Sequence, residues 1–120
     1  MLEVKMNLNE IIEKLQLTTL SGQENINTNV SGGYTGDLLS DVIANSKEKN
    51  LWITLQTHQN IVAVAKLKDL AGIIIVNNRE PLENTIEKAK EEKVPLLCSS
   101  MMAFDVSGKL YSLLDQSDEL

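Results

Sequence analysis

The sequence predicts an α/β domain, with a mainly parallel sheet of about four to five strands and helices on its faces. Short runs rich in β-branched residues alternate with helical patterns of about ten residues, as in consecutive βα units. The run 71–76 is apolar throughout, as in a strand covered on both faces. At 120 residues, 1–120 forms one domain that is large enough for a single core.

The amino-terminal part predicts a helix and two strands. Apolar residues recur at helical spacing over 7–15, and Asn7 with Glu10 matches a capping box. The segment 17–20 is a short apolar–polar run that suits an edge strand. Apolar and polar residues alternate over 25–30, which predicts a second strand.

The stretch 31–42 carries the glycines Gly32, Gly33 and Gly36, followed by an amphipathic pattern. These features predict a tight turn and a helix that opens at Asp37. Asp37 suits the N-cap, and a base or a metal ligand is the other role open to it. The helix would point its free N–H groups into the turn.

Three further strands are expected at 51–55, 71–76 and 94–98, with a buried helix at 61–67 between the first two. Pro81 suits the first position of the next helix.

The carboxyl-terminal part predicts a last helix over about 101–114, which Gly108 interrupts or ends early. Ser99 and Ser100 can cap this helix, and the acidic tail 115–120 is expected to fray.

Composition excludes several functional classes. The formal charge is −6, the eleven basic residues are scattered or paired with acids, and the chain has only four aromatic residues, so nucleic-acid binding is not expected. No apolar run is long enough to span a membrane, and no secretory signal is present, so a cytoplasmic location is expected. The single cysteine, Cys98, excludes an internal disulfide and a multi-cysteine zinc site.

A ligand site is expected where the carboxyl ends of the strands meet the helix N-termini, because ligands of open parallel sheets gather there. Four such strand-to-helix junctions are expected. The second, after the strand 51–55, contains Gln56, and the third, after the strand 71–76, contains Arg79. Small neutral hydrogen-bonding groups at such junctions suit an anionic or polar small molecule. The candidate ligand-binding residues are Gly33, Thr35, Gly36, Asp37, Thr57, His58, Asn60, Asn78, Ser99 and Ser100.

Each candidate also has a structural interpretation. The glycine stretch matches neither G-x-G-x-x-G nor G-x-x-x-x-G-K-[ST], and a purely structural role in the turn is the other interpretation of its glycines. His58, the only histidine, can act as a general base or anion donor, or else cap and pack. Cys98 suits a buried hydrophobic position, and a Cys98–His58 dyad requires neighbouring strands. No catalytic residue, metal ligand or cofactor is assigned.

Five segments together resemble a stand-alone DRTGG-domain protein, similar to the N-terminal domain of HPr serine kinase/phosphorylase. The resemblance runs from about Leu8 to Tyr111. It implies an α/β domain that is cytoplasmic, prone to self-association and without the kinase's catalytic half. In other proteins the domain is fused to phosphotransacetylases and to CBS-domain pairs. The segments that carry the resemblance are 33–42, 52–65, 71–76, 103–106 and 109–111.

The chain departs from the family pattern at one point: the Asp-Arg-Thr-Gly-Gly string is absent, and Leu38 stands where the arginine would follow Gly36-Asp37. The leading hypothesis is a non-catalytic regulatory or ligand-sensing module that binds a small anionic or nucleotide-like metabolite and forms a homodimer. One alternative is an interaction scaffold or accessory subunit of a metabolic enzyme. The other is a small enzyme that uses His58.

Overall fold

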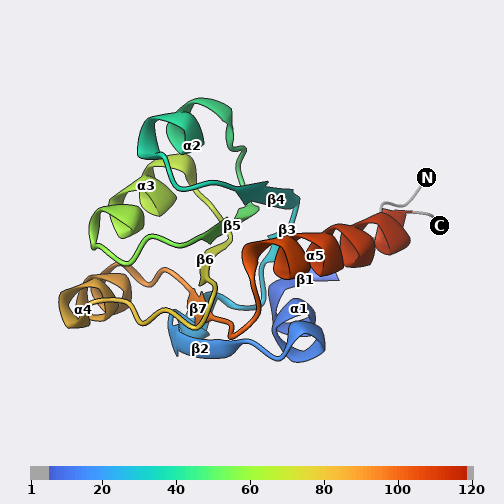
Figure 1. Ribbon diagram of the computed structural model, residues 1–120, viewed down its shortest axis with the longest axis horizontal. Helices are drawn as coiled ribbons and strands as arrows, with labels where there is room; N and C mark the ends of the chain where they lie inside the picture. Colours follow the sequence, from blue (N-terminus) through green and yellow to red (C-terminus); the bar gives the residue numbers. More distant parts are fainter. Residues whose placement is uncertain (1–5, 119–120) are drawn as a thin grey trace.

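A five-stranded sheet lies at the centre of the computed structural model, which describes residues 6–118 (Figure 1). The strand order is β2-β7-β6-β5-β4. The strands β4 (Gly32–Thr35), β5 (Asn50–Thr54), β6 (Gly72–Ile75) and β7 (Leu96–Cys98) are parallel, and β2 (Thr18–Ser21) pairs antiparallel with β7. The predicted fold class is confirmed.

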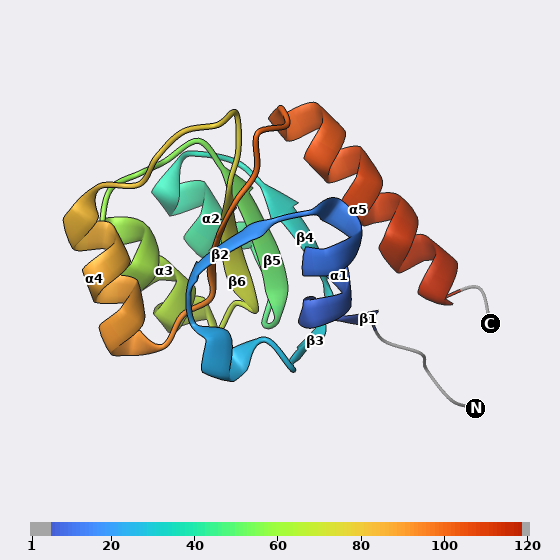
Figure 2. The same ribbon diagram turned by 90° about the horizontal axis from the view of Figure 1, so that it is seen from below.

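Helices cover both faces of this sheet, so the domain has three layers (Figures 1 and 2). The crossover helices α2 (Leu39–Asn45), α3 (Asn60–Lys68) and α4 (Glu83–Glu92) lie on one face. On the other face, α1 (Leu8–Leu15) packs beside α5 (Ala103–Asp118).

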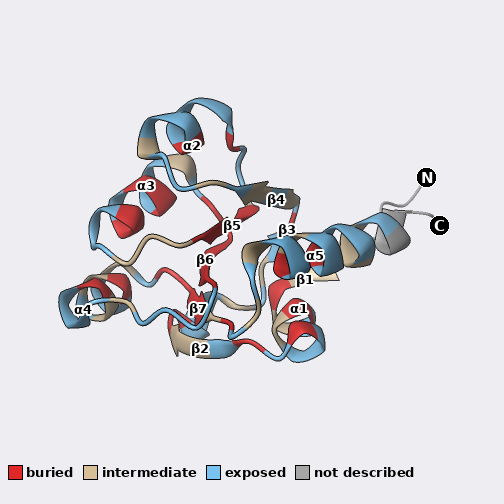
Figure 3. Ribbon diagram, in the orientation of Figure 1, coloured by how far each residue is buried: buried red, intermediate tan, exposed pale blue. Residues whose placement is uncertain are grey.

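The central strands are buried on both faces, as Figure 3 shows in red. Trp52 and Ile73 point into the core under α2, α3 and α4, while Leu51, Ile53 and Ile74 point into the core under α1 and α5. Successive side chains of a strand alternate between faces, so two cores require apolar residues at every position. This requirement explains the unbroken apolar runs in the sequence.

The amino-terminal helix is confirmed, including its capping box: the Asn7 side chain accepts from the Asn9 N–H, and Glu10 accepts from the Asn7 N–H. The strand predicted over 25–30 is mostly wrong. Only β3 (Asn29–Val30) is extended, in a small pairing with β1 (Met6–Asn7), because asparagines favour turns over strands.

A 3₁₀ turn, η1 (Gln23–Asn25), occupies the start of that predicted strand. The Asn25 side-chain amide donates to the Lys93 carbonyl at 2.7 Å, which fixes this turn against the end of α4.

The predicted turn at Gly32 and Gly33 is also wrong, because both glycines belong to the edge strand β4. A Cβ atom added to Gly33 would lie 2.9 Å from the Leu110 side chain, so the glycine lets α5 pack closely on the strand. The following helix begins at Leu39 rather than at Asp37, and Asp37 does not cap it.

The carboxyl-terminal half departs from the predictions at three places. Pro81 lies two residues before α4, which begins at Glu83. Ser99 and Ser100 precede α5 by several residues and do not cap it, since α5 begins at Ala103. The helix α5 runs to Asp118 without the interruption predicted at Gly108, and 119–120 lies outside the described residues.

Candidate functional site

The loops that follow β5 and β6 run together at the carboxyl ends of the parallel strands (Figure 2). This end of the sheet is called its carboxyl edge. The Thr57 carbonyl joins them, because it accepts from the Leu82 N–H at 3.2 Å and from the buried Thr85 hydroxyl at 2.8 Å. The first residues of α4 are therefore anchored to the loop after β5.

Asp37 connects the loop after β4 to the end of β5. One carboxylate oxygen accepts from the Thr54 hydroxyl at 2.8 Å and from the Leu55 N–H at 2.7 Å. The Asp37 carbonyl accepts from the Gln56 side-chain amide at 2.8 Å. A carboxylate has about four lone-pair sites, so Asp37 can still accept from a ligand hydroxyl or amino group.

A polar cavity of about 210 Å³ lies where these three loops meet. Arg79 is the only arginine in the sequence, and it lines this cavity from the loop after β6. Within residues 6–115, whose side chains the structure describes, its guanidinium forms no ion pair. The cavity is lined by Asp37, Leu55, Gln56, Thr57 and Arg79.

Two left-handed asparagines hold the loop that carries Arg79. Asn77 and Asn78 have φ angles of 63° and 56°, a conformation that asparagine tolerates better than most residues. Their N–H groups donate to the carbonyls of Met101 and Ser99 at 2.7 and 3.0 Å. The loop after β6 is therefore fixed to the segment between β7 and α5.

Arg79 also lines a second cavity, of about 400 Å³, between the start of α4 and the edge strand β2. Leu20, Ile86 and Cys98 give this cavity apolar walls, and Asn78 contributes an amide. Burial raises the pKa of the Cys98 thiol, and the nearby Glu80 carboxylate raises that pKa further. The two cavities thus share one cation and differ in polarity.

The other polar candidates lie outside the polar cavity. His58 is exposed, and its Nδ1 accepts from the N–H of Asn60, the first residue of α3, at 3.3 Å. The Cys98–His58 dyad is wrong: β6 separates β5 from β7, so the strands preceding the two residues are not neighbours. Asp41 lies elsewhere and accepts from Tyr34 and Asn45.

The remaining candidates divide between two other places. Gly33 and Thr35 line a groove beside α5, where the Thr35 and Ser107 hydroxyls are 2.7 Å apart. The Gly36 carbonyl accepts from the Trp52 indole N–H at 2.8 Å. Ser99 is buried and its hydroxyl accepts from the Met101 N–H, while Ser100 is exposed.

Of the ten candidates, then, only Asp37 and Thr57 meet in the polar cavity, and Asn78 lines its neighbour. Gln56 and Arg79 complete the polar cavity; the sequence placed both at the junctions where a site was expected, but neither was among the ten candidates. The signal that could have selected Arg79 is its uniqueness: it is the one arginine of the chain, and it directly follows a buried strand and two asparagines.

Within the described part of the chain, no three His, Cys, Asp or Glu side chains are grouped so that they could hold a metal ion. Among the same residues, no helix has the length and apolar character needed to cross a bilayer.

Comparison with solved structures gives a similar fold. The regulatory region of Clostridium perfringens pyrophosphatase, solved with its CBS and DRTGG domains and the activator diadenosine tetraphosphate, matches with a TM-score of 0.65 at 15% sequence identity. The match covers 88% of this chain and 45% of that chain, so this chain spans less than half of its length. No protein-family model and no curated protein matches the sequence. At this identity the likeness shows the fold alone.

Proposed function

We propose that this domain is a non-catalytic regulatory module that senses a small nucleotide-like ligand through Arg79. The observation that carries the proposal is the placement of the chain's one arginine, without an ion-pair partner among the described residues, between two cavities at the carboxyl edge of the sheet. A guanidinium presents a rigid set of donors that matches a phosphate.

The polar cavity suits a part of a nucleotide rather than a whole one. Its volume of about 210 Å³ is below the usual range of small-molecule sites, which begins near 300 Å³. A phosphate on Arg79 would place ribose hydroxyls within reach of an acceptor such as Asp37. The adjoining cavity of about 400 Å³, with walls from Leu20 and Ile86, would take the base.

The charges of the cavity favour a nucleotide over a bare anion. Arg79 attracts phosphate, whereas the Asp37 carboxylate repels it and attracts hydrogen-bond donors. A ligand that carries both an anionic group and donors therefore matches the site better than inorganic phosphate does.

The structural likeness supports this proposal. The Clostridium perfringens protein is a regulatory region, and its activator is a nucleotide. The resemblance to DRTGG domains and to the HPr kinase N-terminal domain points to the same class of regulatory module. We further propose that the domain is cytoplasmic and that it self-associates or docks on a metabolic enzyme, the arrangement that the resemblance implies.

Thermal unfolding with AMP, ADP, ATP, acetyl phosphate and inorganic phosphate tests the proposal. At 100 times its dissociation constant a ligand adds about 2.7 kcal/mol, which raises the melting temperature of a domain of this size by on the order of 10 °C. A nucleotide should give this shift, and inorganic phosphate should give a smaller one.

The matched variants are Arg79→Gln and Lys47→Gln. Both remove one positive charge from an exposed residue. Lys47, however, lies in the loop before β5, at the amino ends of the parallel strands. Arg79→Gln should abolish the nucleotide shift and Lys47→Gln should keep it. A shift that survives Arg79→Gln, or none with any nucleotide, contradicts the proposal.

A further inference from the structure

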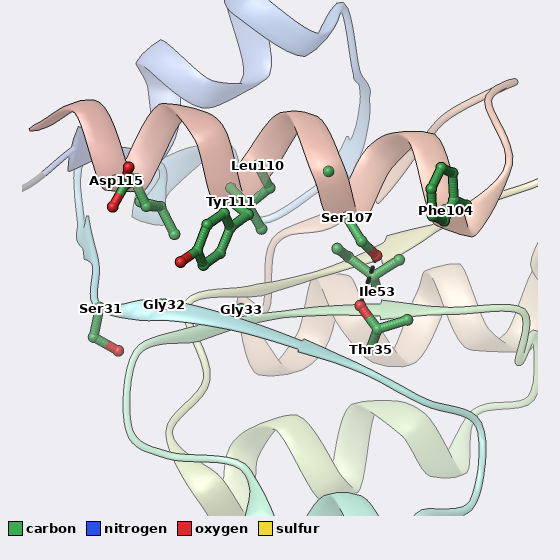
Figure 4. Close-up of a pocket in the computed structure, with 12 residues that line it drawn as sticks. Ser31, Gly32, Gly33, Thr35, Ile53, Phe104, Ser107, Leu110, Tyr111 and Asp115 are labelled. Atoms are coloured by element: carbon green, nitrogen blue, oxygen red, sulfur yellow. Dashed lines mark hydrogen bonds between the residues drawn. The ribbon is translucent and has the colours of Figure 1, made fainter.

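A groove of about 670 Å³ lies between α5 and the edge strand β4, away from the cavities that Arg79 lines (Figure 4). Gly32 and Gly33 of the strand form one side, and Phe104, Tyr111 and Leu114 of α5 form much of the other. The groove was not expected from the sequence, because the two segments are some seventy residues apart, as the Thr35–Ser107 contact shows with its separation of 72.

The strand that borders this groove has an unprotected edge. It is the last strand of the sheet, and its pairing with β5 runs from Gly32↔Asn50 to Thr35↔Ile53 without a register shift. The Gly36 N–H, directly after β4, donates to the Ile53 carbonyl of β5 at 3.1 Å. Since alternate residues of a strand direct their N–H groups to opposite sides, Tyr34 directs its N–H to β5 like Gly36, whereas Gly33 and Thr35 direct theirs away from the sheet.

The two edges of the sheet differ in this respect. The opposite edge strand, β2, has a register shift between Thr19 and Ser21, and such irregularities discourage pairing with another chain. The strand β4 carries no charge, no proline and no register shift. Proteins usually protect a free edge by one of these devices, so an edge without them suits a partner strand.

The helix beside this edge presents exposed aromatic side chains. Phe104 is 87% exposed and Tyr111 is 73% exposed, although aromatic side chains bury large areas when they are covered. Between them lies Gly108, where an added Cβ would meet no atom within 4 Å. Packing within the monomer therefore does not require a glycine there, and its small size leaves room for a neighbouring molecule.

We propose that a second copy of this chain occupies the groove, with the two β4 strands paired antiparallel about a two-fold axis perpendicular to the sheet. Such an axis keeps both α5 helices on the same face, where their aromatic side chains cover one another. A dimer of this kind is isologous, the commonest arrangement among soluble oligomers. The uncharged strand also brings no like charges together, although each chain carries a net charge of −6.

The surface area that this arrangement could bury is consistent with a stable dimer. Large aromatic side chains bury roughly 150–250 Å² each, so Phe104 and Tyr111 from two copies supply at most about 600–1,000 Å². Standard interfaces bury about 1,200–2,000 Å² in total, and the paired strands and the rest of the groove would supply the remainder.

Sedimentation equilibrium of the full chain tests this interface. The inference rests on the proposed self-association and is independent of ligand binding at Arg79. The wild type should sediment as a dimer, and Phe104→Glu and Tyr111→Lys should each sediment as a monomer. The charges of both variants suit their positions near the start and in the later half of α5, so the helix should remain folded. Leu67→Glu, at an apolar position of α3 that is 68% exposed, is the matched control and should remain a dimer.

Hydrogen exchange supplies a second measurement that needs no variant. The amides of Gly33 and Thr35 should become more protected as the wild-type concentration rises through the dimerisation range. A wild-type monomer at every concentration overturns both the self-association and the interface. A wild-type dimer that survives both α5 variants, or amides whose protection does not change, overturns the interface alone.

Discussion

The Asp37 carboxylate shows how one side chain can define the geometry of a site. It accepts from Thr54 and from the Leu55 N–H, and so it holds the loop after β4 against the end of β5. The sequence pattern suggested a helix cap because an aspartate stood before an amphipathic run. The carboxylate instead bonds to residues about eighteen positions away, and no local pattern encodes such a partner.

Replacement of Asp37 should therefore destabilise the fold as well as the site. Hydrogen bonds to a charged group contribute about 1.5–3 kcal/mol, so Asp37→Ala should lower the free energy of unfolding by roughly 1–3 kcal/mol. Urea denaturation followed by circular dichroism measures this change. Glu91→Ala removes the carboxylate of an exposed helical residue that forms a surface ion pair with Lys88; it is the control and should cost less than about 1 kcal/mol. An unchanged urea midpoint for Asp37→Ala would contradict a stabilising role for these hydrogen bonds.

The thiol of Cys98 gives a prediction on pH. Burial, and then Glu80, raise its pKa above the ordinary value of 9.0, so the native state holds this proton more tightly than the unfolded state does. The stabilisation is complete below about pH 9 and is lost as the pH rises through the native pKa. The rate of iodoacetamide alkylation, measured from pH 7 to 10.5, should reach its midpoint above 9.0. Glu80→Gln should shift that midpoint downwards, and a midpoint below 9.0 in the wild type would be inconsistent with this environment.

Helices and strands could be predicted from the sequence where the residues that determine them are close together in the chain. The capping box before α1 and the two-sided burial of β6 are encoded by residues within a few positions of one another. The glycines of β4 misled the prediction, because a glycine favours a turn locally, whereas Gly33 exists for the approach of Leu110 in α5. Gly108 misled it in the opposite direction, since α5 passes through that residue unbroken.

The glycines provide a test at the scale of elements. Gly108→Ala should stabilise α5 by roughly 0.5–1 kcal/mol, because alanine is the better helix former and no atom lies within 4 Å of the new Cβ. Gly22→Ala should lower the free energy of unfolding by more than about 1 kcal/mol. Gly22 has a φ of 77°, and an added Cβ would lie 2.4 Å from the Pro95 backbone. Urea denaturation at one low protein concentration measures both. Equal effects of the two substitutions would show that the packing around them is not as described.

At the scale of the molecule, the class of fold predicted from the sequence is confirmed, and a site at the carboxyl edge of the sheet stays a prediction. The sequence could not predict which junction residues meet, because that depends on strand order and on the loops' contacts with one another. Thr57 reaches the site through its bonds to Leu82 and Thr85, and Arg79 through the two left-handed asparagines before it. His58 remains outside, because its Nδ1 is turned towards the first turn of its own helix.

The proposed ligand binding at Arg79 and the proposed self-association through β4 and α5 use different surfaces of the molecule. The cavities at Arg79 lie at the carboxyl edge of the sheet, whereas the groove of Phe104 and Tyr111 lies beside the edge strand β4. The two surfaces should therefore fail separately. Arg79→Gln should leave the oligomeric state unchanged in sedimentation, and Phe104→Glu should leave the nucleotide-dependent rise in melting temperature in place. Loss of both properties in either variant would contradict this separation.

Titration of the isotope-labelled protein with ADP, followed by amide chemical shifts, tests the proposed ligand site most directly. Saturable shifts are expected at the amides of Leu55, Gln56, Thr57 and Arg79, and these shifts should be lost in Arg79→Gln but not in Lys47→Gln. Shifts confined to β4 and α5, or no saturable shift at the carboxyl edge with ADP, would contradict this proposal.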